Sequence, residues 1–320
     1  MIFRDIKTNS AETRISYVLL ILLALIPFTA GCSFFSSIDK SAKRIVRDVR
    51  SPGGNLKKKV GVAFFENKTF LLNQGEEQHY LNYFVENIKK SCSEIILVKP
   101  GDPEYPDFLV KIPKHESGWV DTLALAEAGR QLGFNAIVTG ALTDITKTQK
   151  ERGFWWFKNI HHFMEVHVTV DVYDTFTGAK LLDESFVQEM EVDETDFEDT
   201  NISNDFLPSI INEALHNIAD QMGEQVCYEV ILQPWKGFIT SIAEDKVTLS
   251  SGKRVGINSG DILEVYDSSE IFSGPLGQRF FVPGLKTGEI KMTSVFIDIA
   301  EAIPISGSNI QKGSSVGLKD

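Results

Sequence analysis

Residues that could bind a metal ion gather near the middle of the chain. His161, His162, Glu165 and His167 offer nitrogen and oxygen atoms of the kind that zinc accepts. If a strand begins by His161, three of the four share one face, because alternate strand residues point to the same side. No cysteine or further carboxylate has ligand spacing beside them, and no residue that would orient the imidazoles is evident. The sequence therefore predicts a solvated polar face here, with no metal ion and no cofactor.

Patterns for catalysis are missing from the sequence. We find no serine elbow, no phosphate-binding glycine loop and no Cys/His nucleophile arrangement. Asp144 and Asp174, near expected strand ends, could form a carboxylate pair, but so could many surface aspartates. The acidic run at 191–199 lacks the regular spacing and turn glycine of an EF-hand calcium loop, so we expect a solvated loop. We predict that the protein is not an enzyme.

Four adjacent aromatic residues lie between two expected strands: Phe154, Trp155, Trp156 and Phe157. Basic residues flank them on both sides. Neighbours on a strand point to opposite faces, so one core cannot take all four, and at least two should be exposed. An exposed aromatic patch usually marks a partner surface or a membrane surface. The alternative is packing against the second domain or against the proline-rich segment at 101–118.

The N-terminal stretch Ile15–Cys32, ISYVLLILLALIPFTAGC, predicts a secretory signal peptide. A short basic segment precedes it, and the apolar run is too short for a settled membrane-spanning helix. Its ending resembles the lipobox of bacterial lipoproteins, although Thr29 stands where that family more often has leucine. The resemblance implies a lipid on Cys32, which becomes the first mature residue and anchors the chain by its acyl chains. An uncleaved signal anchor is the alternative. Ser33 is not the aspartate that favours inner-membrane retention, so the resemblance implies the outer membrane.

Two further cysteines, Cys92 and Cys227, would then remain in an oxidising compartment. Both lie at the ends of expected helices that should pack on one face of a sheet. A disulfide and two buried thiols are the two alternatives for this pair.

Composition and charge limit the classes of function. The chain has 320 residues, of which 42% are hydrophobic, enough for two cores behind a leader. Its net charge of −12 argues against nucleic-acid binding, which needs a basic face. We divide the chain into a lipoprotein signal peptide (1–31), a basic flexible tether (32–58), a mixed α/β domain (59–232) and a small β-barrel domain (233–320). The tether could rest on anionic headgroups or be a solvated linker.

Hydrophobic periodicity predicts the elements of both domains. Strands are expected at 60–65, 95–98, 136–142, 166–172 and 180–190, and helices at about 81–88, 119–132 and 205–227. A turn is expected at 66–69, and a short edge strand at 108–112. This order makes a mixed sheet flanked by helices. Short β segments follow at 238–240, 246–249, 262–266, 288–291 and 294–297, separated by glycine turns, as in a small SH3-like barrel.

Three phrases of the α/β domain resemble an extracytoplasmic family: VGVAFFENKT, LALAEAGRQLGFNAIVTGALTDI and VHVTVDVYDTFTGAKLL. Its members include the curli secretion lipoprotein, the lipoprotein activators of penicillin-binding proteins, the N-terminal domain of the Tol-Pal translocation protein and the middle domain of flagellar assembly protein T. GKRVGINSGD and IQKGSSV resemble the C-terminal SH3-like domain of the last of these. The resemblance implies scaffolds and binding modules.

We therefore expect a lipid-anchored, periplasm-facing scaffold of an envelope complex, with flagellar basal-body ring assembly as the first hypothesis. The alternatives are a secretion-pore subunit like the curli lipoprotein and an activator of a peptidoglycan synthase. The expected partners are the membrane, through the lipid, and proteins of the complex, which include further copies of this chain. For a pore, the stretches 147–163 and 189–204 would have to span, yet the first carries Lys147, Lys150 and Arg152 and the second is acidic.

Overall fold

A computed structural model describes residues 56–69, 76–198, 206–275 and 277–319. The expected signal peptide, Cys32 and nearly all of the tether lie outside the described residues. No helix in the described part of the chain combines the length and the hydrophobicity needed to cross a membrane. The elements of the α/β domain are β1 (Lys58–Val62), β2 (Glu66–Asn67), α3 (Glu76–Ser91), β3 (Ile95–Val98), α4 (Asp107–Val110), α5 (Thr122–Gln131), β4 (Ala136–Phe154), β5 (Phe157–Asp174), β6 (Lys180–Val192), α6 (Glu194–Glu198) and α7 (Phe206–Leu232).

A mixed sheet forms the centre of the α/β domain. Its strands follow the order β3-β1-β4-β5-β6, with β2 paired to β4. β1 runs parallel to β3 and β4, because helices make the crossovers between these strands. β5 and β6 are antiparallel to their neighbours, because short turns connect them. The structure confirms the predicted mixed α/β fold.

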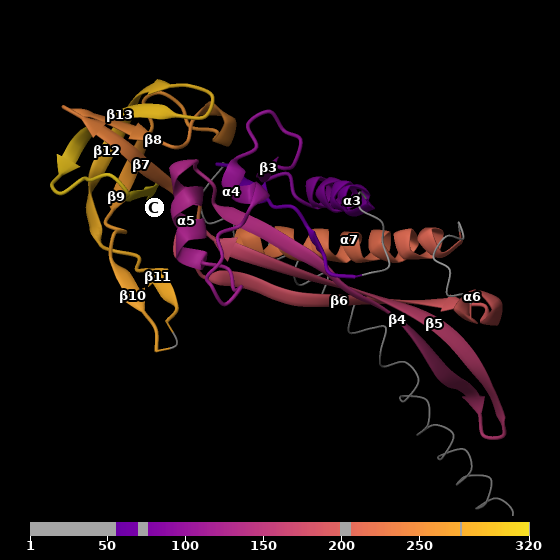
Figure 1. Ribbon diagram of the computed structural model, residues 1–320. Coiled ribbons are helices and arrows are strands. Elements are labelled where there is room, and N and C mark those ends of the chain that lie inside the picture. The colour runs from indigo at the N-terminus through magenta and orange to yellow at the C-terminus, as the bar shows by residue number, and fades with distance from the viewer. Residues whose placement is uncertain (1–55, 70–75, 199–205, 276, 320) are drawn as a thin grey trace, which may run out of the picture. The chain divides into compact units, whose positions relative to one another are not determined.

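Helices cover both faces of the sheet near its parallel strands. α3 and α7 lie side by side on one face (Figure 1), where they pack on Val166, Val168 and Val170 of β5. α4 and α5 cover the other face, together with Phe134. The alternating valines of β5 are fully buried, as expected for the core-facing side of a strand.

A disulfide joins Cys92, directly after α3, to Cys227 in α7. The side-by-side packing of the two helices brings these positions together, with their Cα atoms 5.6 Å apart. Of the two alternatives that the sequence left open for this pair, the structure has the bonded form.

Two segments of the first half of the domain differ from the sequence predictions. The expected turn at 66–69 contains β2, which pairs with Ala141 and Leu142 of β4. The expected edge strand at 108–112 is instead the helix α4, which begins after Pro106. The fixed φ of proline suits the start of a helix, and the buried Leu109 holds the short helix on the sheet.

Two further predictions fail at the ends of strands. The acidic run is not a plain loop, because its first residues extend β6 and Glu194–Glu198 form α6. Phe197 holds this turn of helix in place, since its ring lies 4.5 Å from that of His162. The separate strand expected at 294–297 is also wrong. The preceding strand continues to Val295, and the next strand begins at Ala300.

A closed, six-stranded antiparallel barrel follows, in the order β12-β13-β8-β7-β14-β9, as the sequence predicted. Ile239, Val265, Ile290 and Val316 fill its core, beside Trp235. The small hairpin β10–β11 lies outside the barrel order. The elements are β7 (Gly237–Ala243), β8 (Lys246–Leu249), η2 (Lys253–Val255), β9 (Ile262–Tyr266), β10 (Ile271–Ser273), β11 (Arg279–Phe281), β12 (Lys286–Val295), β13 (Ala300–Gly307) and β14 (Ser315–Leu318).

Arg130, in the last turn of α5, connects the α/β domain to the barrel. Its guanidinium donates hydrogen bonds to the carbonyls of Thr175 and Ser268, each at 3.0 Å, and to that of Phe176. The same group lies 3.5 Å from the ring centroid of Phe281, a cation–π contact. Burial lowers the pKa of Arg130 to about 10.

Lys58, at the start of β1, caps the C-terminal end of α7 with its side chain. Its Nζ donates to the carbonyls of Val230 (3.1 Å) and Ile231 (2.7 Å), which have no helical partner at a C-terminus. The side chain is buried, and this burial lowers its pKa to about 8, partly offset by Glu94.

The buried Lys58 amine predicts a stability that rises in mildly alkaline solution. Above about pH 8 the folded chain releases this proton, whereas the unfolded chain keeps it until about pH 10.4. The unfolded state then binds more protons, so the free energy of unfolding increases with pH. Relative to Lys58→Met, the wild type should gain about 2 kcal/mol between about pH 7 and about pH 9.5 in urea denaturation. Parallel pH profiles for the two proteins would contradict this assignment.

Candidate functional site

The hairpin of β4 and β5 extends farther than the rest of the sheet. β6 accompanies it only to Val192, which pairs with His162. Beyond that point β4 and β5 pair only with each other, up to Phe154 opposite Phe157. In Figure 1 the two strands run on past the N-terminal end of α7 to their turn. The chain thus carries its four adjacent aromatics, at 154–157, on a two-stranded projection.

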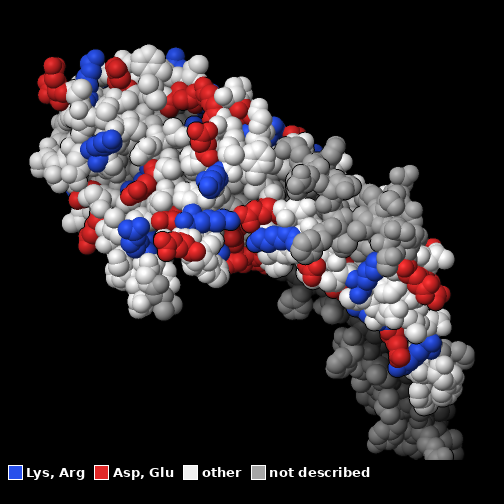
Figure 2. Space-filling view, in the orientation of Figure 1, with Lys and Arg blue, Asp and Glu red and all other residues white. Residues whose placement is uncertain are grey.

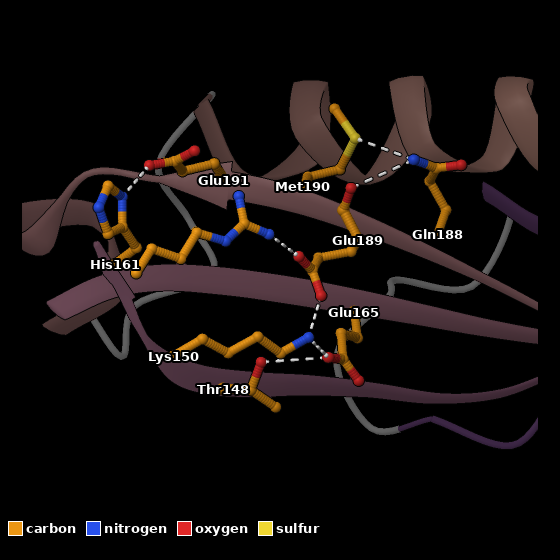
Figure 3. Close-up of polar contacts among 9 residues, drawn as sticks. Thr148, Lys150, His161, Glu165, Gln188, Glu189, Met190 and Glu191 are labelled. Carbon is orange, nitrogen blue, oxygen red and sulfur yellow. Dashed lines mark hydrogen bonds and ion pairs between the residues drawn. The ribbon is translucent and has the colours of Figure 1, made fainter. Parts of the chain in front are cut away.

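One face of the projection holds a network of ion pairs (Figure 3). Lys150 of β4 contacts Glu165 of β5 at 2.9 Å and also Glu189 of β6. The other carboxylate oxygen of Glu189 accepts from Arg152, at 2.9 Å. Thr148 donates to Glu165 at 3.2 Å. Side chains of three neighbouring strands are therefore joined, because the long basic side chains of β4 reach carboxylates of β5 and β6.

The charged network covers an aromatic ring. Phe163 lies on the same face, and only 2% of its surface is exposed. The Arg152 guanidinium lies 4.3 Å from its ring centroid, and Lys150 Nζ lies 5.4 Å away. Such contacts let the long stems of basic residues shield an apolar ring while their charges stay in water. On this face, which no helix covers, the side chains of Lys150 and Arg152 thus shield Phe163 from solvent.

Electrostatics within the network favour the charged forms of its members. The hydrogen bonds that Lys150 donates to Glu189 and Glu165 raise the pKa of Lys150. The bond from Lys150 lowers the pKa of Glu165. His161 Nδ1 lies 2.6 Å from Glu191 Oε1 and lowers the pKa of that carboxyl group. Neutral pH therefore keeps Glu165, Glu191 and Lys150 charged.

Trp155 and Trp156 form the two-residue turn at the end of the hairpin. Phe154, Trp155 and Trp156 are 82%, 71% and 70% exposed, so no described residue of the barrel or of the proline-rich segment covers them. The indole rings of Trp155 and Trp156 stack with centroids 4.4 Å apart. We call these three residues the aromatic tip; the side chain of Phe157 is not among those that the structure describes.

The backbone of the aromatic tip is strained. Trp155 has φ +58°, a left-handed conformation that glycine and asparagine adopt easily. For a residue with a Cβ this conformation costs about 1–2 kcal/mol. Glycine at position 155 would make the same connection more cheaply, because only the first of the two turn residues has a positive φ. The chain instead displays two exposed indoles there, which points to use of the tip rather than to stability.

Charges lie behind the aromatic tip and balance one another. On the second face of the hairpin, Lys158 contacts Glu151 at 2.9 Å, and Ile160 beside them is 62% exposed. Figure 2 shows basic and acidic side chains interspersed along the projection, whose end carries neither. The tip is therefore apolar, and its supporting strands are close to neutral.

The histidines near 161 do not form a metal centre. His161 pairs with Glu191, His162 lies against Phe197, and His167 Nε2 lies 3.7 Å from Glu165 Oε2. No group of three potential ligands is assembled among the described residues. The imidazoles belong to the polar surface of the strands.

Asp144 and Asp174 do not form a carboxylate pair. Asp174 lies opposite Ala136 at one end of β4, whereas Asp144 lies opposite His167 well along the strand. Asp174 is buried and accepts hydrogen bonds from the amides of Phe176 and Thr177. Burial raises its pKa despite these bonds. Its contacts define the turn before β6, which is a structural role.

A cleft of about 790 Å³ lies between the loop before α5, the turn after β5 and the β10–β11 hairpin. Trp119, 74% exposed, stands on its wall. Its basic side chains already face carboxylates: Lys180 lies 3.1 Å from Asp171, and Arg279 lies 3.9 Å from Asp121. Sequence reasoning did not predict this cleft, because the segments that line it are distant in the chain.

The fold and the projection define a class: an α/β domain with a long sheet hairpin, followed by a closed barrel. No family model and no curated protein matches the sequence. Solved structures with a similar fold include the PelC dodecamer from Paraburkholderia phytofirmans (13% identity, TM-score 0.27, 57% of this chain and 94% of that one). The lipoprotein GNA1162 from Neisseria meningitidis is similar at 12% identity (TM-score 0.27, 51% and 99%). The hypothetical protein CT253 from Chlamydia trachomatis is similar at 12% identity (TM-score 0.31, 53% and 98%).

Sequence reasoning identified the aromatic residues but missed the ion pairs behind them. Glu189 was grouped with neither Lys150 nor Arg152, which precede it by more than 30 positions. The missing signal is register. In the sheet, Glu165 lies opposite Glu189, and the long side chain of Lys150 reaches both carboxylates.

Proposed function

We propose that this protein is a lipid-anchored, periplasm-facing scaffold of a cell-envelope complex, without enzymatic activity. The lipid at Cys32 would hold it at the outer membrane, and the aromatic tip would make a second contact. The exposed tip is the observation that supports this role most strongly. A strained, solvent-facing pair of indoles on a braced hairpin has no evident purpose within the chain itself.

Flagellar basal-body ring assembly is the more specific proposal. It rests on the order of the two domains, an α/β domain followed by a small barrel, together with the resemblance of their sequence phrases to flagellar assembly protein T. Ring assembly also implies contacts between copies of this chain.

Affinity purification from envelopes in gentle detergent tests this proposal. The wild type should recover flagellar ring proteins. Trp155→Gly/Trp156→Asn and Trp119→Phe, which replaces a similarly exposed tryptophan elsewhere, should both recover as much as the wild type, because the tip is proposed to contact the membrane. Recovery of peptidoglycan synthases alone would contradict the flagellar assignment.

A secretion-pore subunit is the second candidate, and the length of the hairpin favours it. β4 has 19 residues and β5 has 18, more than the roughly 9–11 that a spanning strand needs. The side chains oppose it. One face carries Lys150 and Arg152, and the other carries Gln149 and Glu151, so neither is apolar. A detergent-stable ring that conducts ions in planar bilayers would support the pore and sink the scaffold.

A further inference from the structure

We infer that the aromatic tip, Phe154, Trp155 and Trp156, inserts into the headgroup region of a lipid bilayer without spanning it. This inference rests on the proposed function, in which the chain is already held at a membrane. The juxtaposition that carries it is an uncharged aromatic end directly in front of a balanced belt of charges.

The chemistry of the tip fits the interface between lipid and water. Tryptophan is enriched there because its ring is apolar and its N–H can still meet water or a headgroup. Behind the tip, Arg152 on one face pairs with Glu189, and Lys158 on the other face pairs with Glu151. Ile160, 62% exposed, extends the apolar surface on the second face.

The size of the tip favours lipid over protein as its occupant. Aromatic side chains bury roughly 150–250 Å² each, so the three together stay below the roughly 800 Å² per partner of a standard protein interface. The network that follows along the shaft is already satisfied within the chain, since Lys150 and Arg152 face Glu165 and Glu189. A bilayer sets no such area requirement, and a tethered chain needs only a weak second contact.

The depth of insertion is limited by the same charges. Ion pairs occupy both faces within a few residues of the turn, and moving them into hydrocarbon would be costly. The tip therefore reaches the headgroups and the first acyl carbons. Because the cations behind the tip are paired with carboxylates, binding of the tip to the membrane should depend little on anionic lipid or on salt.

Quenching of tryptophan fluorescence by brominated lipid tests the inference. The full-length lipidated chain is placed in phosphatidylcholine vesicles with and without brominated acyl chains. Wild type and Trp119→Phe should both be quenched. Trp155→Gly/Trp156→Asn should lose nearly all of that quenching while its unfolding midpoint stays at or above that of the wild type, because glycine adopts the positive φ of position 155 without strain. Equal quenching of the wild type and the turn variant, or no quenching of the wild type, would overturn the inference.

Two further readouts sharpen the test. Quenching should persist from about 0.05 M to about 0.5 M salt. A steep loss of quenching with salt would show that the chain binds by charge pairing with lipid headgroups, which would overturn the inference that the tip inserts. Flotation of the same vesicles reports the anchor separately. A chain that floats but is not quenched contradicts the tip insertion alone. A chain that does not float contradicts the proposed anchor. In that case the tryptophan fluorescence of the wild type is measured again with excess brominated lipid, and a lack of quenching there overturns the inference.

Discussion

Loss of the Cys92–Cys227 disulfide is expected to lower the free energy of unfolding by about 5 kcal/mol, since the bond closes a loop with a sequence separation of 135. The bond restricts the unfolded chain, and the restriction grows with loop length. It also fixes α3 to α7, the two helices that cover one face of the sheet. Urea denaturation followed by circular dichroism, with and without reductant, measures the difference.

The double variant Cys92→Ala/Cys227→Ala is the matched control for reduction. It should unfold at the midpoint of the reduced wild type, apart from a small effect of the two lost sulfur atoms, and reductant should not change it. A reductant effect on the wild type below about 1 kcal/mol would contradict a stabilising disulfide.

Replacing Arg130 with methionine is expected to lower the free energy of unfolding by about 2–4 kcal/mol. The guanidinium donates to three carbonyls, and charged hydrogen bonds are worth about 1.5–3 kcal/mol each. Its desolvation costs about 3 kcal/mol, as its pKa of about 10 indicates. Removing the side chain recovers that cost but leaves the carbonyls of Thr175, Phe176 and Ser268 without this donor. The fluorescence of Trp235, buried beside the barrel core, would follow the transition.

Arg254→Met provides the control at an exposed arginine. Arg254 pairs with Asp298 at 3.0 Å on the surface of the barrel, and exposed pairs contribute about 0–1 kcal/mol. If both variants lost the same small amount, Arg130 would not be the junction between the domains. A loss confined to Arg130→Met supports that role.

Local pattern was sufficient for much of the fold. The valines at alternate positions from Val166 to Val172 predicted β5, and Leu81, Phe84 and Ile88 predicted α3, because burial on one face leaves a period in the sequence. The ends of the strands were harder to predict from the sequence. β4 was expected to end at 142 but continues to Phe154, since residues 143–154 pair with β5 without an apolar face of their own.

The candidate site was predictable only in part for the same reason. Four adjacent aromatics cannot share one core, so exposure of some was foreseeable from Trp155 and Trp156 alone. Their place at the end of a projection was not, because it depends on the register of β4 with β5. The supporting pairs Lys150–Glu189 and Arg152–Glu189 join residues from two strands that are separated by a third in sequence. Composition alone could not distinguish these paired residues from unpaired charges on a solvated surface.

Photo-crosslinking in intact envelopes tests whether the aromatic tip contacts lipid. A photoreactive phenylalanine analogue is placed at Trp155 in one protein and at Trp119 in another, since both positions are similarly exposed. We predict that the label at 155 transfers to lipid, seen as a mass increase on the peptide that carries the tip, and that the label at 119 does not. Equal labelling at the two positions, or transfer from position 155 to protein alone, would contradict it.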